Sequence, residues 1–182
     1  KTFMSIFTLW LAEGETVVTK AAAHVISNGN FYAFLGAALA VILAGFGSSI
    51  GVGRAGQASA GLLSKDPSKF GNVLLLQLLP ATQGMYGFVI AFMVFIRMGV
   101  VGGAPVTLTY DQGLAIMMFC LPVALVGLVS AIYQGQVAIG GINLIGKQEG
   151  QMGHAMTMTV LVEIFAILSF AISFLGVMLM KF

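Results

Sequence analysis

The amino-acid sequence predicts an all-α membrane protein with four transmembrane helices. Of its 182 residues, 59% are hydrophobic and only 8% are charged, and the mean hydropathy is +1.02. Soluble globular domains carry roughly 25% charged residues, so water is not the main solvent of this chain. Four long runs contain no charge apart from one acid in the last: 21–53, 70–96, 112–146 and 150 up to Lys181. Each exceeds the roughly 20 residues with which a helix crosses the hydrocarbon core.

Residues 1–28 precede the first predicted span and form an N-terminal extension. It begins with Lys1 and ten mostly apolar residues, a pattern similar to the start of a signal peptide but without a convincing cleavage motif. Ten apolar residues are too few to span a bilayer. We therefore expect an interfacial helix that carries Phe7 and Trp10, lies on the membrane and remains part of the chain.

Short polar or glycine-rich segments separate the predicted helices at 64–69, 99–105 and 146–150. Short loops make consecutive helices antiparallel, which gives two helical hairpins at 29–100 and 101–182. The first and third loops then share one membrane face. Lys and Arg are divided four against four between the faces, so the positive-inside rule does not set the orientation.

The two hairpins resemble a duplicated unit. An offset of about 80 residues places the segment that starts at Gln83 over the segment that starts at Glu163. An offset of 82 places residues 49–54 over 131–136. Both alignments keep the polar positions, with a glutamine in the first repeat where the second repeat has its acid.

Small and bulky residues separate onto different helices. The first and third helices are rich in glycine and include the small-xxx-small pattern of Gly47 and Gly51, which lets helix backbones approach closely. The second and fourth helices carry the bulky residues Phe88, Phe92, Phe95, Phe165, Phe170 and Phe174. A thin inner layer and a bulky outer layer predict one sector of a closed ring of identical subunits, with a single compact bundle as the alternative.

Glu163 is the leading functional candidate because it is the one acid near the middle of the fourth apolar run. A charge at the bilayer centre costs on the order of a few kcal/mol, so such residues usually face a partner, a cavity or an ion. The competing hypothesis is an acid that stays protonated as a hydrogen-bonding strut between helices.

Two glutamines are predicted to lie at the depth of this acid. Gln83, Gln134 and Glu163 each stand about 11 to 12 residues from the polar-loop face, or roughly 17 to 18 Å at 1.5 Å per residue. Thr82 adjoins Gln83, and Pro80 opens the helical hydrogen-bond ladder nearby, which leaves backbone acceptors free. Equal depth on three helices indicates one site, although glutamines and threonines also serve as contacts between membrane helices.

The predicted site offers oxygen ligands, one negative charge and no soft ligand, which suits a hard cation better than a transition metal. Na⁺ matches the single charge of Glu163, whereas a divalent ion would leave a buried net positive charge. A proton on Glu163 is the rival occupant and would need far fewer ligands.

Several other functions find no support in the sequence. The lone Cys120 argues against a disulfide framework or a cysteine metal site. The formal charge of +2 is scattered, without the basic patch that binds nucleic acid. A glycine pattern at 51–56 lies inside a membrane helix rather than between a strand and a helix, so it does not indicate a nucleotide site. We expect no catalytic site in this chain.

Three segments resemble the proteolipid rotor subunits of V-type ATPases, the K or c proteolipids, and above all the bacterial sodium-translocating form. They are Leu76-Gln-Leu-Leu-Pro-Ala-Thr-Gln-Gly-Met-Tyr-Gly-Phe88, Ser130-Ala-Ile-Tyr-Gln-Gly135 and Leu161-Val-Glu-Ile-Phe-Ala166. The resemblance covers about residues 31–182. It implies sodium ligands at the Leu79 carbonyl, Thr82, Gln83, Gln134 and Glu163, and a tyrosine at Tyr86 that bonds to the acid.

The resemblance also implies partners and a location. A stator subunit would supply an arginine that faces the emptied carboxylate, and central-stalk subunits would dock on the polar loops. The expected function is therefore a Na⁺-carrying rotor-ring subunit, an integral, multi-pass protein of the bacterial plasma membrane in contact with lipid. The alternatives are a proton-carrying rotor of the same family, a small secondary antiporter that uses Glu163, and a purely structural membrane protein.

Overall fold

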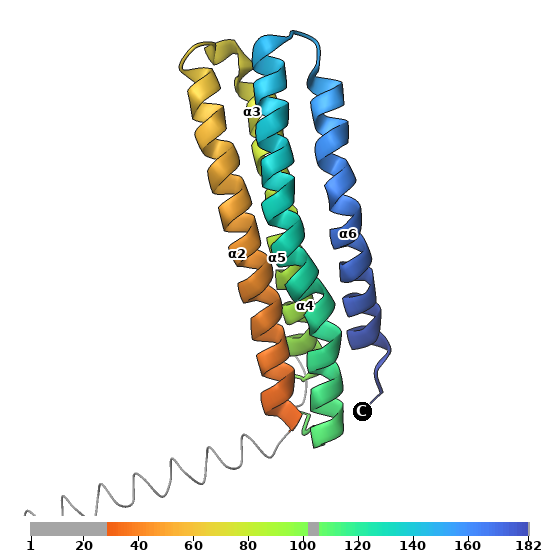
Figure 1. Cartoon of the computed structure of the whole chain (residues 1–182). Helices are drawn as coiled ribbons and strands as arrows, with labels where there is room; N and C mark the ends of the chain where they lie inside the picture. Colours follow the sequence, from red (N-terminus) through yellow and green to blue (C-terminus); the bar gives the residue numbers. More distant parts are fainter. Residues whose placement is uncertain (1–28, 102–105, 182) are drawn as a thin grey trace, which may run out of the picture.

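A computed structural model describes residues 29–101 and 106–181 of the chain. The interfacial helix expected within residues 1–28 lies outside the described residues. Within them, the elements are α2 (Gly29–Leu63), η1 (Pro67–Lys69), α3 (Phe70–Leu78), η2 (Leu79–Ala81), α4 (Thr82–Arg97), α5 (Tyr110–Lys147) and α6 (Met152–Leu179) (Figure 1).

These elements form four apolar spans, because η1, α3, η2 and α4 follow one another without a loop. The spans Gly29–Leu63, Pro67–Arg97, Tyr110–Lys147 and Met152–Leu179 are each long and apolar enough to cross a membrane. The described ranges contain helices and no strand. The predicted all-α architecture with four membrane helices is therefore confirmed, and the protein is an integral membrane protein.

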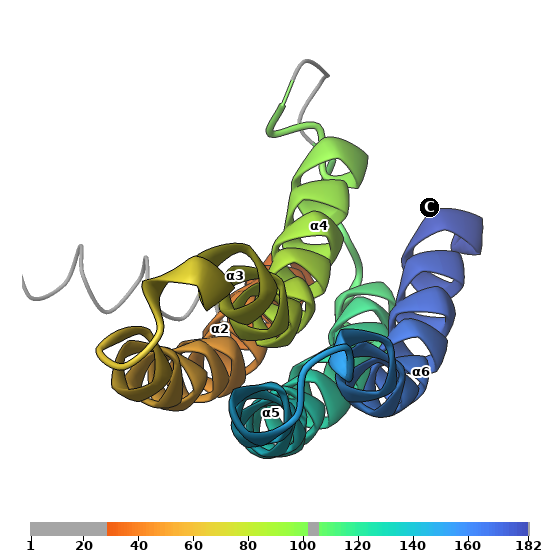
Figure 2. The ribbon, with the colours of Figure 1, turned by 90° about the horizontal axis from the view of Figure 1, so that it is seen from above.

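The helices lie in two layers. Seen from above, α2 and α5 are neighbours, and α4 and α6 both lie on the same side of this pair (Figure 2). Large apolar side chains cover much of the layer that α4 and α6 form, where Phe88 and Phe165 are 60% and 65% exposed. Such faces suit lipid or a neighbouring subunit rather than water. This arrangement agrees with the predicted thin and bulky layers.

Glycines allow α2 and α5 to pack almost backbone to backbone. A Cβ placed on Gly47 would collide with the carbonyl oxygen of Leu128, and one on Gly51 would collide with that of Ala131. A Cβ on Gly135 would lie 2.5 Å from the Cα of Gly51. The small-xxx-small pattern therefore marks a close helix crossing, as the sequence predicts.

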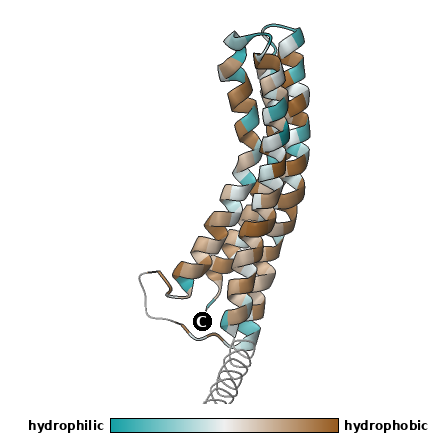
Figure 3. Ribbon diagram, turned by 90° about the vertical axis from the view of Figure 1, so that its left-hand side faces the viewer, coloured by the Kyte–Doolittle hydropathy of each residue, from teal (hydrophilic) through white to brown (hydrophobic). Residues whose placement is uncertain are grey.

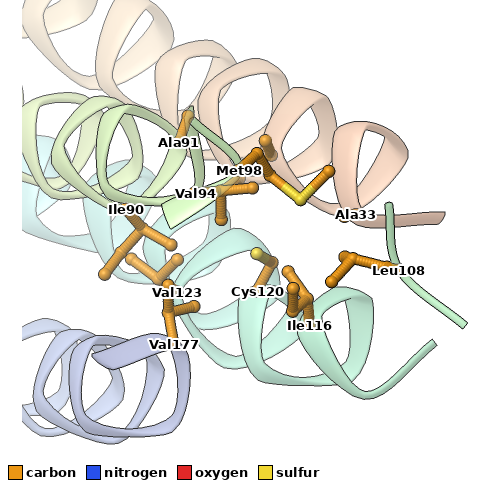
Figure 4. Close-up of a cluster of buried hydrophobic side chains, with 12 residues drawn as sticks. Ala33, Ile90, Ala91, Val94, Met98, Leu108, Ile116, Cys120, Val123 and Val177 are labelled. Carbon is orange, nitrogen blue, oxygen red and sulfur yellow. The ribbon is translucent and has the colours of Figure 1, made fainter. Parts of the chain in front are cut away.

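The apolar core is divided into two clusters along the helices. One contains Ile90, Val94, Ile116, Cys120 and Val123 and lies toward the end away from the polar loops (Figure 4). The other lies toward those loops and consists of Ala55, Val73, Leu76, Ala138, Ile142, Ile145 and Ala155. Between the clusters, each span contributes buried polar side chains, including Ser48, Gln83, Gln134 and Glu163.

The first and third loops meet at one end of the molecule, where hydrophilic residues gather (Figure 3). Lys69 Nζ lies 3.3 Å from Glu149 Oε1 and 3.9 Å from Asp66 Oδ2, so an ion pair joins the two loops. The Ser68 hydroxyl donates to Asp66 Oδ1 at 2.5 Å, and this bond lowers the pKa of Asp66 below its usual value. These loop charges are thus paired with one another as well as solvated.

The close crossing of α2 and α5 makes a testable prediction. Gly51→Ala would force a methyl group against the Ala131 carbonyl oxygen and to within 2.8 Å of Pro80 Cβ. Overpacking of this kind costs about 1–3 kcal/mol. We expect a clear fall in the unfolding midpoint in detergent, measured by circular dichroism. Gly153→Ala, at a site with nothing within 4 Å, is the matched control and should leave the midpoint at or slightly above that of the parent protein.

Candidate ion-binding site

A break in the second span shapes one wall of the site. Pro80 is buried and has no backbone N–H, and the chain forms the 3-10 turn η2 between α3 and α4. The Leu79 carbonyl is not left free, because it accepts from the backbone N–H of Thr82 and from the Thr82 hydroxyl at 2.9 Å. The turn thereby places the Leu79 carbonyl and the Thr82 hydroxyl side by side.

Glu163 lies at the centre of the site and is only 7% exposed. The Tyr86 hydroxyl donates to its Oε1 at 2.6 Å. Gln134 Nε2 and Gln83 Nε2 donate to its Oε2 at 2.7 and 3.1 Å. The structure thus brings together polar residues from α4, α5 and α6 that the sequence predicted at one depth, and it surrounds the carboxyl group with hydrogen-bond donors.

The Gln134 amide has an orientation set by the backbone of α6. Its Nε2 donates to the Thr159 carbonyl at 3.2 Å, and a carbonyl oxygen can only accept. Reversing the amide would bring two oxygens together, so this contact assigns nitrogen and oxygen within the side chain. Gln134 Oε1 therefore faces Gln83, which donates to it at 2.6 Å.

Three oxygens converge on the nitrogen of Gln83. They are Gln134 Oε1 at 2.6 Å, Glu163 Oε2 at 3.1 Å and Ser130 Oγ at 3.4 Å. An amide nitrogen carries two hydrogens, so it cannot satisfy all three acceptors well. The position of this nitrogen is therefore electrostatically favourable for a positive charge. In this structure, the partly positive NH2 group of Gln83 occupies it.

A hard cation fits this donor set. Thr82 Oγ1 and Gln83 Oε1 lie 3.4 Å apart on the same wall, which adds oxygens to those of Gln134 and Glu163. Oxygen ligands with one negative charge suit a small monovalent cation. No cluster of three or more His, Cys, Asp or Glu residues occurs within the described parts of the chain, as a transition-metal centre would require. The role of these residues as ion ligands stays a prediction.

Sequence reasoning did not single out Ser130 or Thr159 as parts of the site. Ser130 Oγ donates to the Val162 carbonyl at 3.2 Å and also contacts Gln83, while Thr159 orients Gln134. Both residues precede a predicted site residue by four positions, Ser130 before Gln134 and Thr159 before Glu163. Helix geometry places such positions on one face, so this spacing was the available signal.

Comparison with known proteins identifies the family. The model of the ATP synthase C-subunit family matches twice, at residues 35–94 and 117–176, which together make up more than half of the chain. The chain belongs to the ATP synthase C-subunit family. The two matches fall on the two hairpins, so the predicted duplication is confirmed, and Glu163 lies in the second copy.

Two relatives from known organisms match most of the chain. The V-type sodium ATPase subunit K of Enterococcus hirae is 44% identical over 152 residues, which cover 84% of this chain and 94% of the relative. The A-type ATP synthase subunit K of Methanocaldococcus jannaschii is 39% identical over 141 residues, or 78% of this chain and 59% of the relative. Each relative is named as subunit K of a larger ATPase or ATP synthase, and the chain belongs to the same family of subunits rather than to the catalytic ones.

Ser130 provides a test of the site that is independent of the acid. Ser130→Ala removes one of the three oxygens that converge on the point where the cation would bind. A contact of this kind is worth about 0.5–1.5 kcal/mol, so cation affinity should fall about twofold to tenfold. The measurement is protection of Glu163 by added sodium against a carboxyl-directed carbodiimide. Ser169→Ala is the matched control, because that similarly buried hydroxyl donates to the Ala166 carbonyl of its own helix and should leave protection unchanged.

Proposed function

We propose that this chain is a rotor-ring subunit of a rotary V-type ATPase and that its site carries Na⁺ across the membrane. The observation that supports this most strongly is the convergence of oxygens from Gln134, Glu163 and Ser130 on one buried point. Family membership supports the rotor role, and the 44% identical subunit K is named as part of a sodium ATPase.

In the proposed mechanism, the cation neutralises Glu163. Exposed apolar side chains flank the acid on α6, with Ile164 and Phe165 at 48% and 65%. Such a face suits contact with lipid as the ring turns. A bare carboxylate at that depth would be costly, whereas a carboxylate that has bound Na⁺ can move past lipid without exposing net charge. Ion binding would thus be the condition for rotation.

Unloading requires a partner. An arginine of a stator subunit would face the emptied carboxylate, and the fixed positive charge would favour release of the cation. Each cation moved works against about 2.3 kcal/mol per 100 mV of membrane potential. ATP hydrolysis by other subunits must supply this energy, transmitted by central-stalk subunits docked on the loops that the Lys69 ion pair joins.

The proposed ring carries few ions for its size. Only the second repeat has an acid, while the first has Gln83 at the corresponding position, so each set of four helices binds one ion. Fewer ions per rotation allow each ion to be moved against a larger gradient for the same number of ATP molecules. This favours pumping over ATP synthesis. We place the assembly in a bacterial plasma membrane.

Family membership favours the rotor role over a secondary antiporter or a purely structural protein. The remaining alternative is a rotor that carries H⁺. A proton on Glu163 needs one or two hydrogen-bond acceptors, whereas the site also directs Gln134 Oε1 and the Thr82 hydroxyl toward Gln83. These additional oxygens support Na⁺ as the transported ion.

Glu163→Gln should abolish ion transport and ion-coupled ATP hydrolysis in the assembled ATPase. The amide keeps the size of the side chain and one acceptor oxygen but loses the charge that binds the cation. The measurement is sodium uptake into vesicles together with ATPase activity. Asp66→Asn, in the exposed loop, should retain sodium binding. Coupled transport that survived Glu163→Gln would rule out the proposed mechanism.

The transported ion can be identified by chemical labelling. Carbodiimides react with a protonated carboxyl group, so millimolar sodium at neutral pH should protect Glu163, and potassium should protect it much less. Gln83→Ala, Gln134→Ala and Thr82→Val should each weaken sodium protection, because each removes an oxygen ligand. Labelling that followed pH alone, with no effect of sodium or of these substitutions, would show that the site carries protons.

A further inference from the structure

The hydrogen bond from Tyr86 to Glu163 depends on the position of the Tyr86 ring, which is only partly buried. Tyr86 is half-buried, and its hydroxyl lies 2.6 Å from Glu163 Oε1. The amides of Gln83 and Gln134 both bind the other oxygen, Oε2. Tyr86 therefore covers the Oε1 side of the carboxyl group, and its rotamer determines whether Oε1 is open or closed.

A second aromatic ring supports Tyr86 from α6. The ring centroids of Tyr86 and Phe170 lie 5.1 Å apart with an interplanar angle of 33°. The ring centroids of Phe170 and Phe174 lie 5.8 Å apart. All three rings pack against the buried cluster that includes Ile90, Val123 and Val177. Phe170 stands seven residues after Glu163, which is about two helical turns along the same face.

We propose that Phe170 is a positioning residue that holds the Tyr86 hydroxyl on Glu163 and so controls how readily the carboxyl group is uncovered. Because Phe170 lies about two turns from Glu163, its effect on the acid passes through Tyr86. The ring of Phe170 and the core cluster together restrict the Tyr86 ring. Without Phe170, Tyr86 gains rotamers in which Oε1 has lost its partner. This inference rests on Glu163 being the site proposed above.

The test is a double-mutant cycle read out as the rate at which a carbodiimide labels Glu163 in sodium-free detergent solution at constant pH. Phe170→Ala should raise the rate about twofold to tenfold, which is the range expected for the loss of one aromatic contact. Tyr86→Phe should raise it at least as much. In the Tyr86→Phe background, Phe170→Ala should add nothing, because the hydroxyl that it positions is already absent.

A conservative variant and a control make the result specific. Phe170→Tyr keeps the ring and should restore most of the parental rate, and Phe170→Leu keeps much of the volume without the ring and should not. Phe174→Ala removes a half-buried ring that stacks on Phe170 rather than on Tyr86, and its effect should be smaller. If Phe170→Ala does not assemble, Phe170→Leu replaces it in the cycle.

Two outcomes would overturn the proposal. One is an unchanged labelling rate in Phe170→Ala and Phe170→Leu. The other is the same fold-increase in the presence and absence of the Tyr86 hydroxyl, which would indicate a general loosening of α6. Sodium protection of the parental protein, measured separately, tests the transported ion. A protein without sodium protection but with a positive cycle would contradict the Na⁺ assignment and leave the role of Phe170 supported.

Discussion

The fold depends on the need to keep one carboxyl group, Glu163, satisfied inside a hydrocarbon environment. A lone acid on an isolated membrane helix would be costly, so the surrounding helices must supply donors. They do so from two directions, with Tyr86 of α4 on one carboxyl oxygen and the amides of Gln83 and Gln134 on the other. Because these donors come from α4 and α5, the position of α6 is determined by polar contacts as well as by packing.

Close packing of the inner helices makes these hydrogen bonds between helices possible. Gly47 and Gly51 bring α2 against α5. A Cβ on Gly87 of α4 would collide with the Ala40 carbonyl oxygen of α2. The glycines therefore draw α4 and α5 onto the same helix, α2. Gln83 and Gln134 can then meet at 2.6 Å. Small residues on α2 and α4 thus set the geometry of the polar site.

The spans and the main site residues could be predicted from the sequence because both follow from simple regularities. Apolar length gives the spans, and equal distance from the loops places Gln83, Gln134 and Glu163 together. The sequence did not show that the Leu79 carbonyl is already hydrogen-bonded to Thr82, because the 3-10 turn at Pro80 depends on local backbone angles. It also did not reveal Ser130 or the contact of Phe170 with Tyr86, since both depend on helix rotation and crossing geometry.

Gln83 explains how the proposed cation site can also be stable without an ion. Its amide can present either a donor or an acceptor to the same point, and in this structure the donor satisfies Gln134 Oε1 and Glu163 Oε2. In the proposed cation-bound state, the ion would replace that N–H, and the amide oxygen could serve as a ligand. A second acid at this position would leave a net negative charge around a monovalent ion. In the proposed mechanism, one glutamine and one glutamate at corresponding positions of the two repeats would therefore give a neutral loaded site, as passage through lipid requires.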